Sequence, residues 1–271
     1  MNRRQLWISL LLLWSLAPML WQLISSFTTT AALVDGGVPF LQRWTLIHYR
    51  QLLSSDPPFW RFLLNSTVLA SASTVLTIAL AIPAAYGLVR LPQRWLRVSR
   101  ALIAGAALFP YVLLFLALLE LARSLNLGNS LLALAIPYSA LSLPLALLLL
   151  TAAFEGLPKD LDDAAKLEGM SLVQRLRWVL IPLIAPATAS TAILVFLFAW
   201  NEYPIALTWL SRSEQLTLPV AMARFAGSSV YSVPYGAYAA ATVLGALPLL
   251  LLVLLFQRQI VSGLTNGAVK G

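Results

Sequence analysis

Length and composition exclude most soluble classes of protein. The chain has 271 residues, of which 60% are hydrophobic and 10% charged, and its mean hydropathy is +0.83. These values are typical of a polytopic membrane protein. A formal net charge of +8 would suggest nucleic acid as the partner of a soluble protein. The positions of the basic residues explain the charge better, so no nucleic-acid partner is expected. The chain has no cysteine, which excludes disulfides and thiolate metal sites.

Apolar runs predict an all-α integral membrane protein with six transmembrane helices and a single transmembrane domain over residues 1–271. The expected spans cover residues 6–24, 62–88, 101–119, 131–153, 182–200 and 235–256. The first run follows Arg3 and Arg4, as in a signal peptide, but it is longer than the roughly 7–15 apolar residues of such a signal. Thr30-Ala31-Ala32 is a poor cleavage site, so a retained first span is expected.

Several prolines lie inside or near the expected spans, where neighbouring helices can satisfy the freed carbonyl groups. They suggest bent helices around a cavity. These prolines are Pro83, Pro110, Pro137, Pro144, Pro186 and Pro248.

The basic residues predict the orientation of the chain. With six spans both termini lie on one side, which collects Arg3, Arg4, Arg90, Arg94, Arg97, Arg100, Lys159, Lys166, Arg175, Arg177, Arg258 and Lys270. The opposite side has Arg43, Arg50, Arg61, Arg123, Arg212 and Arg224. Twelve basic residues against six place the termini in the cytoplasm, together with the charged segment 155–181.

Residues 155–181 form a charged island between two apolar runs, and local signals predict a short helix in it. Pro158 suits the first turn of a helix, and Asp160, Asp162 and Asp163 place negative charge where the helix dipole favours it. Gly169 can take the left-handed conformation that ends the helix.

A second helix is expected directly after this one, because Ser171 and Gln174 form a capping-box pair. In the first helix, Leu161, Ala164, Ala165 and Glu168 share a face by their spacing. The two small alanines would let another surface approach the backbone closely. The pattern therefore predicts a docking helix; the alternative is a solvated loop whose charges keep it out of lipid.

The island resembles the EAA loop of binding-protein-dependent ABC permeases, whose pattern is Glu-Ala-Ala, three residues, Gly, nine residues and Ile-x-Leu-Pro. The matching residues are Asp163, Ala164, Ala165, Gly169, Val179, Ile181 and Pro182. Asp replaces Glu, Val replaces Ile and Ile replaces Leu, so charge or apolar character is kept. The resemblance implies that Leu161, Asp163, Ala164, Ala165, Glu168, Gly169 and Pro182 couple the chain to an ATPase.

Shorter matches extend the resemblance over most of the chain. They include the stretches 44–49, 85–90 and 198–203, and the tail 263–271 is close to the end of maltose/trehalose-type subunits. The resemblance implies the fold of a type I ABC importer permease in the cytoplasmic (inner) membrane of a bacterium or archaeon. Implied partners are a second homologous permease subunit, two cytoplasmic ABC ATPase subunits, which bind the ATP, and an extracytoplasmic sugar-binding protein.

The permease itself is expected to be non-catalytic and to need no cofactor, because the chain has no Gly-x-x-x-x-Gly-Lys loop. A secondary transporter would want ionisable residues in mid-span and an internal repeat, and neither is apparent. A membrane-embedded enzyme would need clustered histidines or carboxylates. The single histidine, His48, is expected in an aqueous loop.

Candidate substrate-path residues lie at the ends of two spans. Asn201 and Tyr203 are the polar and aromatic types that sugars need, and they flank Glu202. Asn65 begins the second span of the resemblance. For Glu202 the alternative is a solvated acid at the membrane boundary.

The long outer segment 204–234 is the candidate contact with the binding protein, through Arg212, Arg224, Gly227 and Ser228. An ordinary exposed loop is the alternative. The expected cargo is a di- or oligosaccharide such as trehalose or maltose, with glycerol-3-phosphate or an amino sugar as alternatives.

Overall fold

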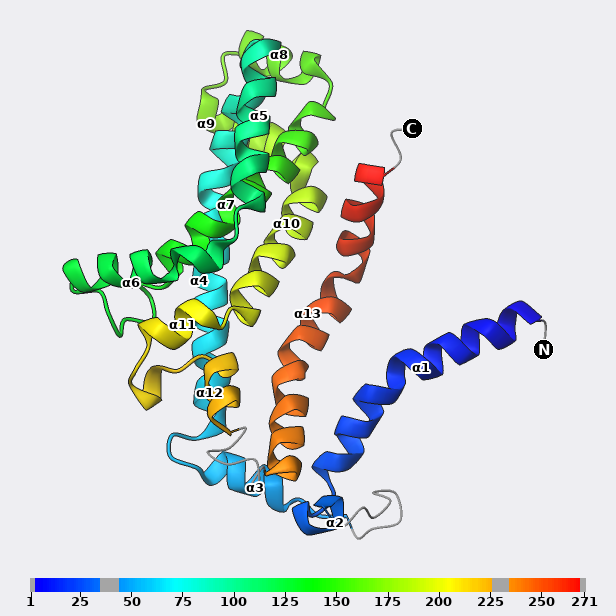
Figure 1. Ribbon diagram of the computed structural model, residues 1–271. Coiled ribbons are helices and arrows are strands. Elements are labelled where there is room, and N and C mark those ends of the chain that lie inside the picture. The colour runs from blue at the N-terminus through cyan, green and yellow to red at the C-terminus, as the bar shows by residue number, and fades with distance from the viewer. Residues whose placement is uncertain (1–2, 35–43, 226–233, 269–271) are drawn as a thin grey trace. The chain divides into compact units, whose positions relative to one another are not determined.

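The computed structural model describes residues 3–34, 44–225 and 234–268 (Figure 1). Within these ranges the chain forms helices and no strand, as the sequence predicts. The elements in chain order are α1 (Arg3–Ser26), α2 (Thr30–Val34), α3 (Ile47–Ser54), α4 (Phe59–Val89), α5 (Gln93–Leu108), η2 (Tyr111–Leu114), α6 (Phe115–Ser124), α7 (Ala135–Glu155), α8 (Lys159–Leu167), α9 (Leu172–Gln174), η3 (Arg175–Leu180), α10 (Ile181–Asn201), α11 (Pro204–Trp209), η4 (Ser213–Gln215), α12 (Leu218–Phe225) and α13 (Tyr235–Ala268).

Five helical segments in the described ranges are long and apolar enough to cross a membrane. They are Arg3–Ser26, Phe59–Val89, Ala135–Glu155, Leu172–Asn201 and Tyr235–Gln257. A sixth span results if the bent pair Gln93–Leu108 and Tyr111–Ser124 counts as one. Five of the six expected spans therefore have counterparts, and the third has one if the bent pair counts as a single span. The all-α membrane fold is confirmed.

The third expected span, 101–119, is the one that differs. It is broken after α5 and bends by 78°. Pro110 has no N–H to continue the helix and disfavours helical geometry in the residue before it. Phe109 is accordingly extended, with φ −67° and ψ 131°. Pro83, Pro144, Pro186 and Pro248 lie inside helices that continue past them, so of these prolines only Pro110 interrupts its helix.

The chain divides into two compact units, residues 1–64 with 216–250 and residues 65–215 with 251–271. The single domain expected over 1–271 stays a prediction.

In the first unit, His48 is buried, with 5% of its surface exposed. Its Nε2 donates to the Thr28 carbonyl oxygen at 2.9 Å. A Cβ at Gly236 would overlap the imidazole, so only glycine fits there without a shift. The aqueous position expected for His48 is therefore wrong, because α3 packs its ring against the start of α13.

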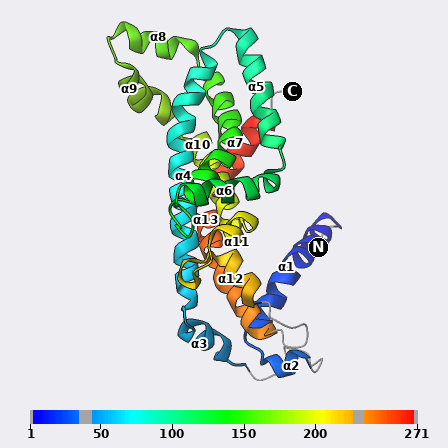
Figure 2. The same cartoon turned by 60° about the vertical axis from the view of Figure 1, so that its left-hand side comes forward.

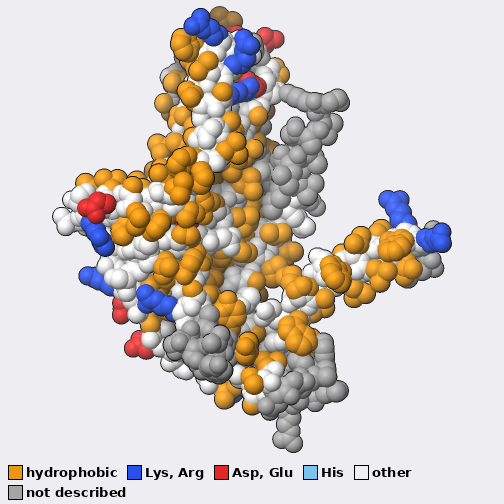
Figure 3. Space-filling view, viewed as in Figure 1, with side chains coloured by type: hydrophobic (Ala, Val, Ile, Leu, Met, Phe, Trp, Pro, Cys, Tyr) orange, Lys and Arg blue, Asp and Glu red, His pale blue; other side chains and the backbone are white. Residues whose placement is uncertain are grey.

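In the second unit, α4, α7 and α10 carry a common apolar core. It includes Ala85, Tyr86, Leu150, Phe154 and Ile184. Beyond one end of this core lie α8 and α9 (Figure 2). Lys, Arg, Asp and Glu side chains gather at that end, whereas orange hydrophobic side chains dominate the surface of the helices next to it (Figure 3).

Candidate functional site

The charged island folds as its local chemistry predicts. Pro158 precedes α8 as its N-cap residue, and Asp160 and Asp162 lie in the first turn. Gly169 has φ +74°, the left-handed region that favours glycine. Ser171 and Gln174 then form a complete capping box at the start of α9. The helix and the turn that reverses the chain after it are confirmed.

The two faces of α8 differ sharply in exposure. Asp162 and Ala165 are buried, with 4% and 6% of their surface exposed. Leu161 is 37% exposed and Leu167 is 91% exposed, the highest value among large hydrophobic side chains in the described residues. Ala164 and Glu168 are exposed too. Helical spacing predicted that Ala165 shares an exposed face with Leu161, Ala164 and Glu168. The structure places Ala165 inside the charged island instead, so the exposed face consists of the other residues.

Asp162 is the centre of an ion-pair cluster. Its carboxylate accepts from Arg175 Nη1 at 2.9 Å and pairs with the Arg90 guanidinium. The Tyr86 hydroxyl donates to the same carboxylate at 3.2 Å, and Lys166 Nζ lies 3.4 Å from it. The cluster joins α8 to η3 and to the end of α4.

Tyr86 connects this cluster to the apolar core. Its ring packs edge-on against Phe154, with the two centroids 5.9 Å apart, and the Arg90 guanidinium lies over the ring at 4.6 Å. Arg175 comes from η3, a π-helical turn of the kind often found at functional sites. Polar and apolar contacts together fix the inner face of α8.

Asp163 lies on the outside of the same turn. Its side chain is 65% exposed and accepts a hydrogen bond from Lys166 at 2.8 Å. This bond and the charge of the ammonium lower the pKa of the Asp163 carboxyl. Of the other predicted coupling residues, Gly169 is exposed, and Pro182 is exposed near the first turn of α10.

Glu202 is buried at the end of α10, with 2% of its surface exposed. Its oxygens accept from the backbone N–H groups of Ile205 at 2.9 Å and Ala206 at 3.0 Å, which caps α11. The Tyr138 hydroxyl donates to the same carboxylate. Glu202 is therefore not a solvated boundary acid, because its acceptor positions are used inside the protein.

The other expected path residues lie apart from this cap. Asn201 is exposed and its amide donates to the Leu197 carbonyl oxygen at 2.8 Å. Tyr203 is half-buried. The Asn65 amide donates to the Glu214 carbonyl oxygen at 2.9 Å, which ties α4 to the segment that carries Arg212.

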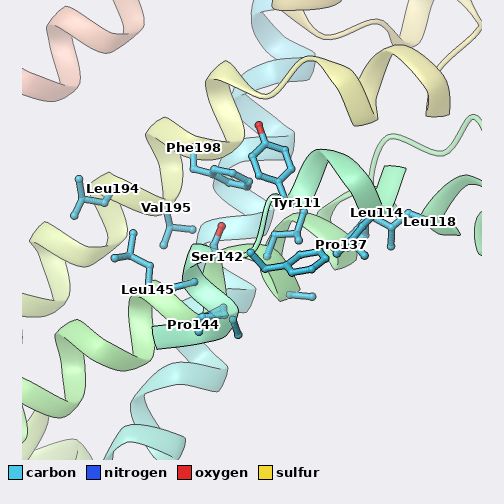
Figure 4. A pocket seen from close by; sticks show the side chains of 16 residues that line it. Tyr111, Leu114, Leu118, Pro137, Ser142, Pro144, Leu145, Leu194, Val195 and Phe198 are labelled. Atoms are coloured by element: carbon cyan, nitrogen blue, oxygen red, sulfur yellow. The ribbon is translucent and has the colours of Figure 1, made fainter. Parts of the chain in front are cut away.

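A cavity of about 820 Å³ opens where α5 breaks (Figure 4). Its walls come from α5, η2, α6, α7 and α10, and they are largely apolar. Tyr111, Ser142 and Phe198 are among the lining residues, and the rings of Tyr111 and Phe198 meet edge-on at 5.4 Å.

Arg212 and Arg224 are exposed, each in its own unit. Backbone and side-chain groups of Ser211 and the backbone N–H of Arg212 donate to Asn129 Oδ1, at 2.6, 2.9 and 3.3 Å. This anchor fixes the backbone at Arg212. Gly227 and Ser228 lie outside the described residues.

Comparison with known proteins decides the family. Residues 73–266 match the model of the binding-protein-dependent transport system inner membrane component. The chain belongs to this family.

Curated relatives of this inner membrane component are similar over nearly their whole length. The sulfoquinovosyl glycerol transport system permease protein SmoH of Agrobacterium fabrum is 39% identical, covering 97% of this chain and 92% of that protein. The trehalose transport system permease protein SugB of Mycobacterium tuberculosis is 38% identical over 95% and 93%. The trehalose/maltose transport system permease protein MalG of Thermococcus litoralis is 38% identical over 94% and 92%.

The fold of this inner membrane component is similar to that of a solved chain. That chain comes from a crystal structure of a bacterial ABC transporter involved in the import of the acidic polysaccharide alginate. The TM-score is 0.76 at 22% identity, with 94% of each chain covered. Membership of this family makes the chain a membrane permease subunit of an ABC importer.

Sequence reasoning missed the roles of five residues of this permease in or beside the charged island. Tyr86, Arg90 and Arg175 surround Asp162, and Leu167 is the most prominent side chain of the outer face. A signal for Leu167 was available, because it follows Leu161 and Ala164 at helical spacing. No sequence signal indicated the role of Arg90, since it lies far from Asp162 along the chain.

Proposed function

We propose that this permease forms half of the translocation path of an ATP-driven sugar importer and docks an ATPase subunit through the outer face of α8. The observation that carries this proposal is the exposed Leu167 on a short helix that begins after Pro158 and ends before the left-handed turn at Gly169. Leu167 is 91% exposed and Leu161 is 37% exposed. With Ala164 they form an apolar patch at a charged end of the protein, and an apolar patch rimmed by polar residues is typical of a surface that binds a partner. The small Ala164 would let the partner approach the backbone.

The outer face also has the charge for docking. Asp163 and Glu168 are exposed beside the apolar side chains, and acids on the rim of such a patch favour a basic partner surface. In this arrangement Leu161, Ala164 and Leu167 meet the ATPase directly. Ala165 and Gly169 act through the shape of the loop, and Pro182 through the start of α10.

The proposed topology places α8 and both termini in the cytoplasm. Its support is the excess of basic residues on that side of the six spans. Because the chain has no cysteine, single cysteines report the topology directly. A membrane-impermeant thiol reagent applied to intact cells should label a cysteine at Arg212, which is exposed, and spare one at Asp163. His48 is unsuitable for this test because it is buried.

For the cargo we propose a di- or oligosaccharide of the trehalose or maltose type, which the names of two relatives at 38% identity support. A sulfonated glycoside is a second candidate, supported by the relative at 39% identity. An amino sugar is a third, since the diacetylchitobiose uptake system permease protein DasC of Streptomyces coelicolor is 31% identical.

The path residues divide by role. Asn201 and Tyr203 offer the polar and aromatic groups that a sugar needs, and Glu202 holds the adjoining turn through its cap on α11. Asn65 holds the segment with Arg212. We propose Arg212 of one unit and, separately, Arg224 of the other as contacts with the binding protein. Gly227 and Ser228 stay predictions from the sequence.

The test is reconstitution with the partner permease, the ATPase subunits and the cognate binding protein. Vesicles should take up sugar when ATP is inside with the ATPase and the loaded binding protein is outside. Trehalose, maltose, a sulfonated glycoside and diacetylchitobiose are offered in turn. Uptake without ATP or without the binding protein would contradict the proposal, and the sugar taken up decides among the cargoes.

A further inference from the structure

The inner face of α8 has a single buried carboxylate that serves two other elements. The Asp162 side chain is 5% exposed, and its oxygens meet Arg175 of η3 at 2.9 Å and Arg90 at the end of α4. Tyr86 of α4 adds a hydroxyl donor at 3.2 Å. Among the ion pairs of the described residues no other acid repeats this role: Asp163 pairs with Lys166 and Glu155 with Arg100.

The charges of this cluster do not balance. One carboxylate faces the two guanidinium groups of Arg90 and Arg175. Lys166 lies 3.4 Å from it as well, but is closer to Asp163, at 2.8 Å. The Arg175 side chain is 12% exposed, so water cannot replace its partner. Without the carboxylate the cations would repel one another, and α8, α4 and η3 would lose their common partner.

The geometry separates this cluster from docking. Asp162 points away from the exposed face that carries Leu161 and Leu167, since it is buried while they are not. A change at Asp162 therefore acts on how α8 is held by its own chain. The η3 turn continues directly into α10, so the cluster reaches two spanning helices, α4 and α10.

We propose that Asp162 is a positioning residue that couples movement of α8 to α4 and α10. An ATPase that moves α8 would drag both spans through the shared carboxylate, whereas without it α8 would move alone. The inference rests on the proposed docking of an ATPase, and it assigns Asp162, Arg90, Arg175 and Tyr86 a transmission role distinct from that of the outer face.

The experiment compares Asp162→Asn with Glu155→Gln in the reconstituted importer. Glu155→Gln also removes a carboxylate from an arginine, but both side chains of that pair are 34% exposed and Glu155 lies outside α8. Asp162→Asn should still recruit the ATPase and hydrolyse ATP, while the sugar transported per ATP falls on the order of tenfold, because α8 then moves without α4 and α10. Glu155→Gln should keep the wild-type ratio.

The outcomes separate the two proposals. If the wild-type permease recruits no ATPase, the proposed function fails. If it recruits the ATPase and Asp162→Asn transports as much sugar per ATP as wild type, the positioning role is overturned while docking stands.

A second variant keeps the test decisive if Asp162→Asn fails to accumulate. In a chain without other cysteines, Asp162→Cys with Arg175→Cys replaces the ion pair by two thiols. Joining them with a short disulfide-forming bifunctional reagent reconnects α8 to η3 and α10 but not to α4. It should therefore restore part of the transport per ATP, and reduction should remove it again. Complete cross-linking without recovery would overturn the proposal.

Discussion

The two faces of α8 lie on one short helix but face different surroundings. The inner face, Asp162 and Ala165, is buried against α4 and η3 and is held by charge and close packing. The outer face, with Leu161, Ala164 and Leu167, is exposed. The difference teaches that neighbouring residues of one motif can have separate tasks, one within the chain and one toward a partner.

Removing the inner carboxylate should have the largest effect on stability. Asp162→Ala leaves Arg175 buried without its partner, which typically costs roughly 3–5 kcal/mol. Arg90 contributes less, because its side chain is 39% exposed. Unfolding of the solubilised permease measures the loss. Asp160→Ala on the exposed side of the same turn should change stability by less than about 0.5 kcal/mol. Equal losses in both variants would erase the distinction between the faces.

The difference between the two faces of α8 can be tested by enlarging each of two adjacent alanines, Ala164 on the outer face and Ala165 on the inner face. Ala165→Trp forces a large side chain into the packed interior of the island and should cost about 1–3 kcal/mol of stability. Ala164→Trp lies on the outside and should leave stability unchanged while it weakens ATPase recruitment. The same unfolding assay, with recruitment measured beside it, separates the two. Reversed effects would show that the faces are wrongly assigned.

Gly169 tests the turn that follows both faces. Its φ of +74° favours glycine, and no atom lies within 4 Å of an added Cβ, so the penalty of a side chain comes from the backbone alone. Gly169→Ala should cost about 1–2 kcal/mol. Gly128→Ala is the control, since an added Cβ also has open space there and its φ lies outside the left-handed region. A neutral Gly169→Ala would contradict the strained turn.

The exposed pair of Asp163 and Lys166 should have the smallest effect. In the folded protein Lys166 lowers the pKa of the Asp163 carboxyl. The stabilisation of the fold by this pair is therefore present at neutral pH and is lost as the pH falls through the lowered pKa. Asp163→Asn should match wild-type stability closely at neutral pH and lack this acid-dependent difference. Thermal unfolding at several pH values measures it, and a large loss at neutral pH would count against the assigned exposure.

Local sequence signals were enough to predict where α8 begins and ends, but not which of its faces is buried. Pro158, Gly169 and the Ser171 capping box determine where the helices begin and end, because they act within a few residues. Which of Asp162 and Asp163 is buried depends on Arg90, and helical spacing alone cannot reveal a partner on another helix.

The same limit explains the other differences. Glu202 is buried because Tyr138 from α7 and the turn of α11 enclose it. The break in the third span was within reach of the sequence, since Pro110 has no N–H to continue the helix. Four other prolines lie inside helices that continue past them, so the sequence alone did not show which proline would interrupt its helix.

Recruitment of the ATPase by Leu167→Asp tests the central claim most directly, that the outer face of α8 docks the ATPase. The variant places a charge where an apolar side chain would enter a partner, and leaves the inner face intact. We expect normal accumulation in the membrane and a fall in affinity for purified ATPase subunits of about thirtyfold or more, since hot-spot residues carry roughly 2 kcal/mol or more. Wild-type affinity in a stably folded Leu167→Asp permease would contradict it.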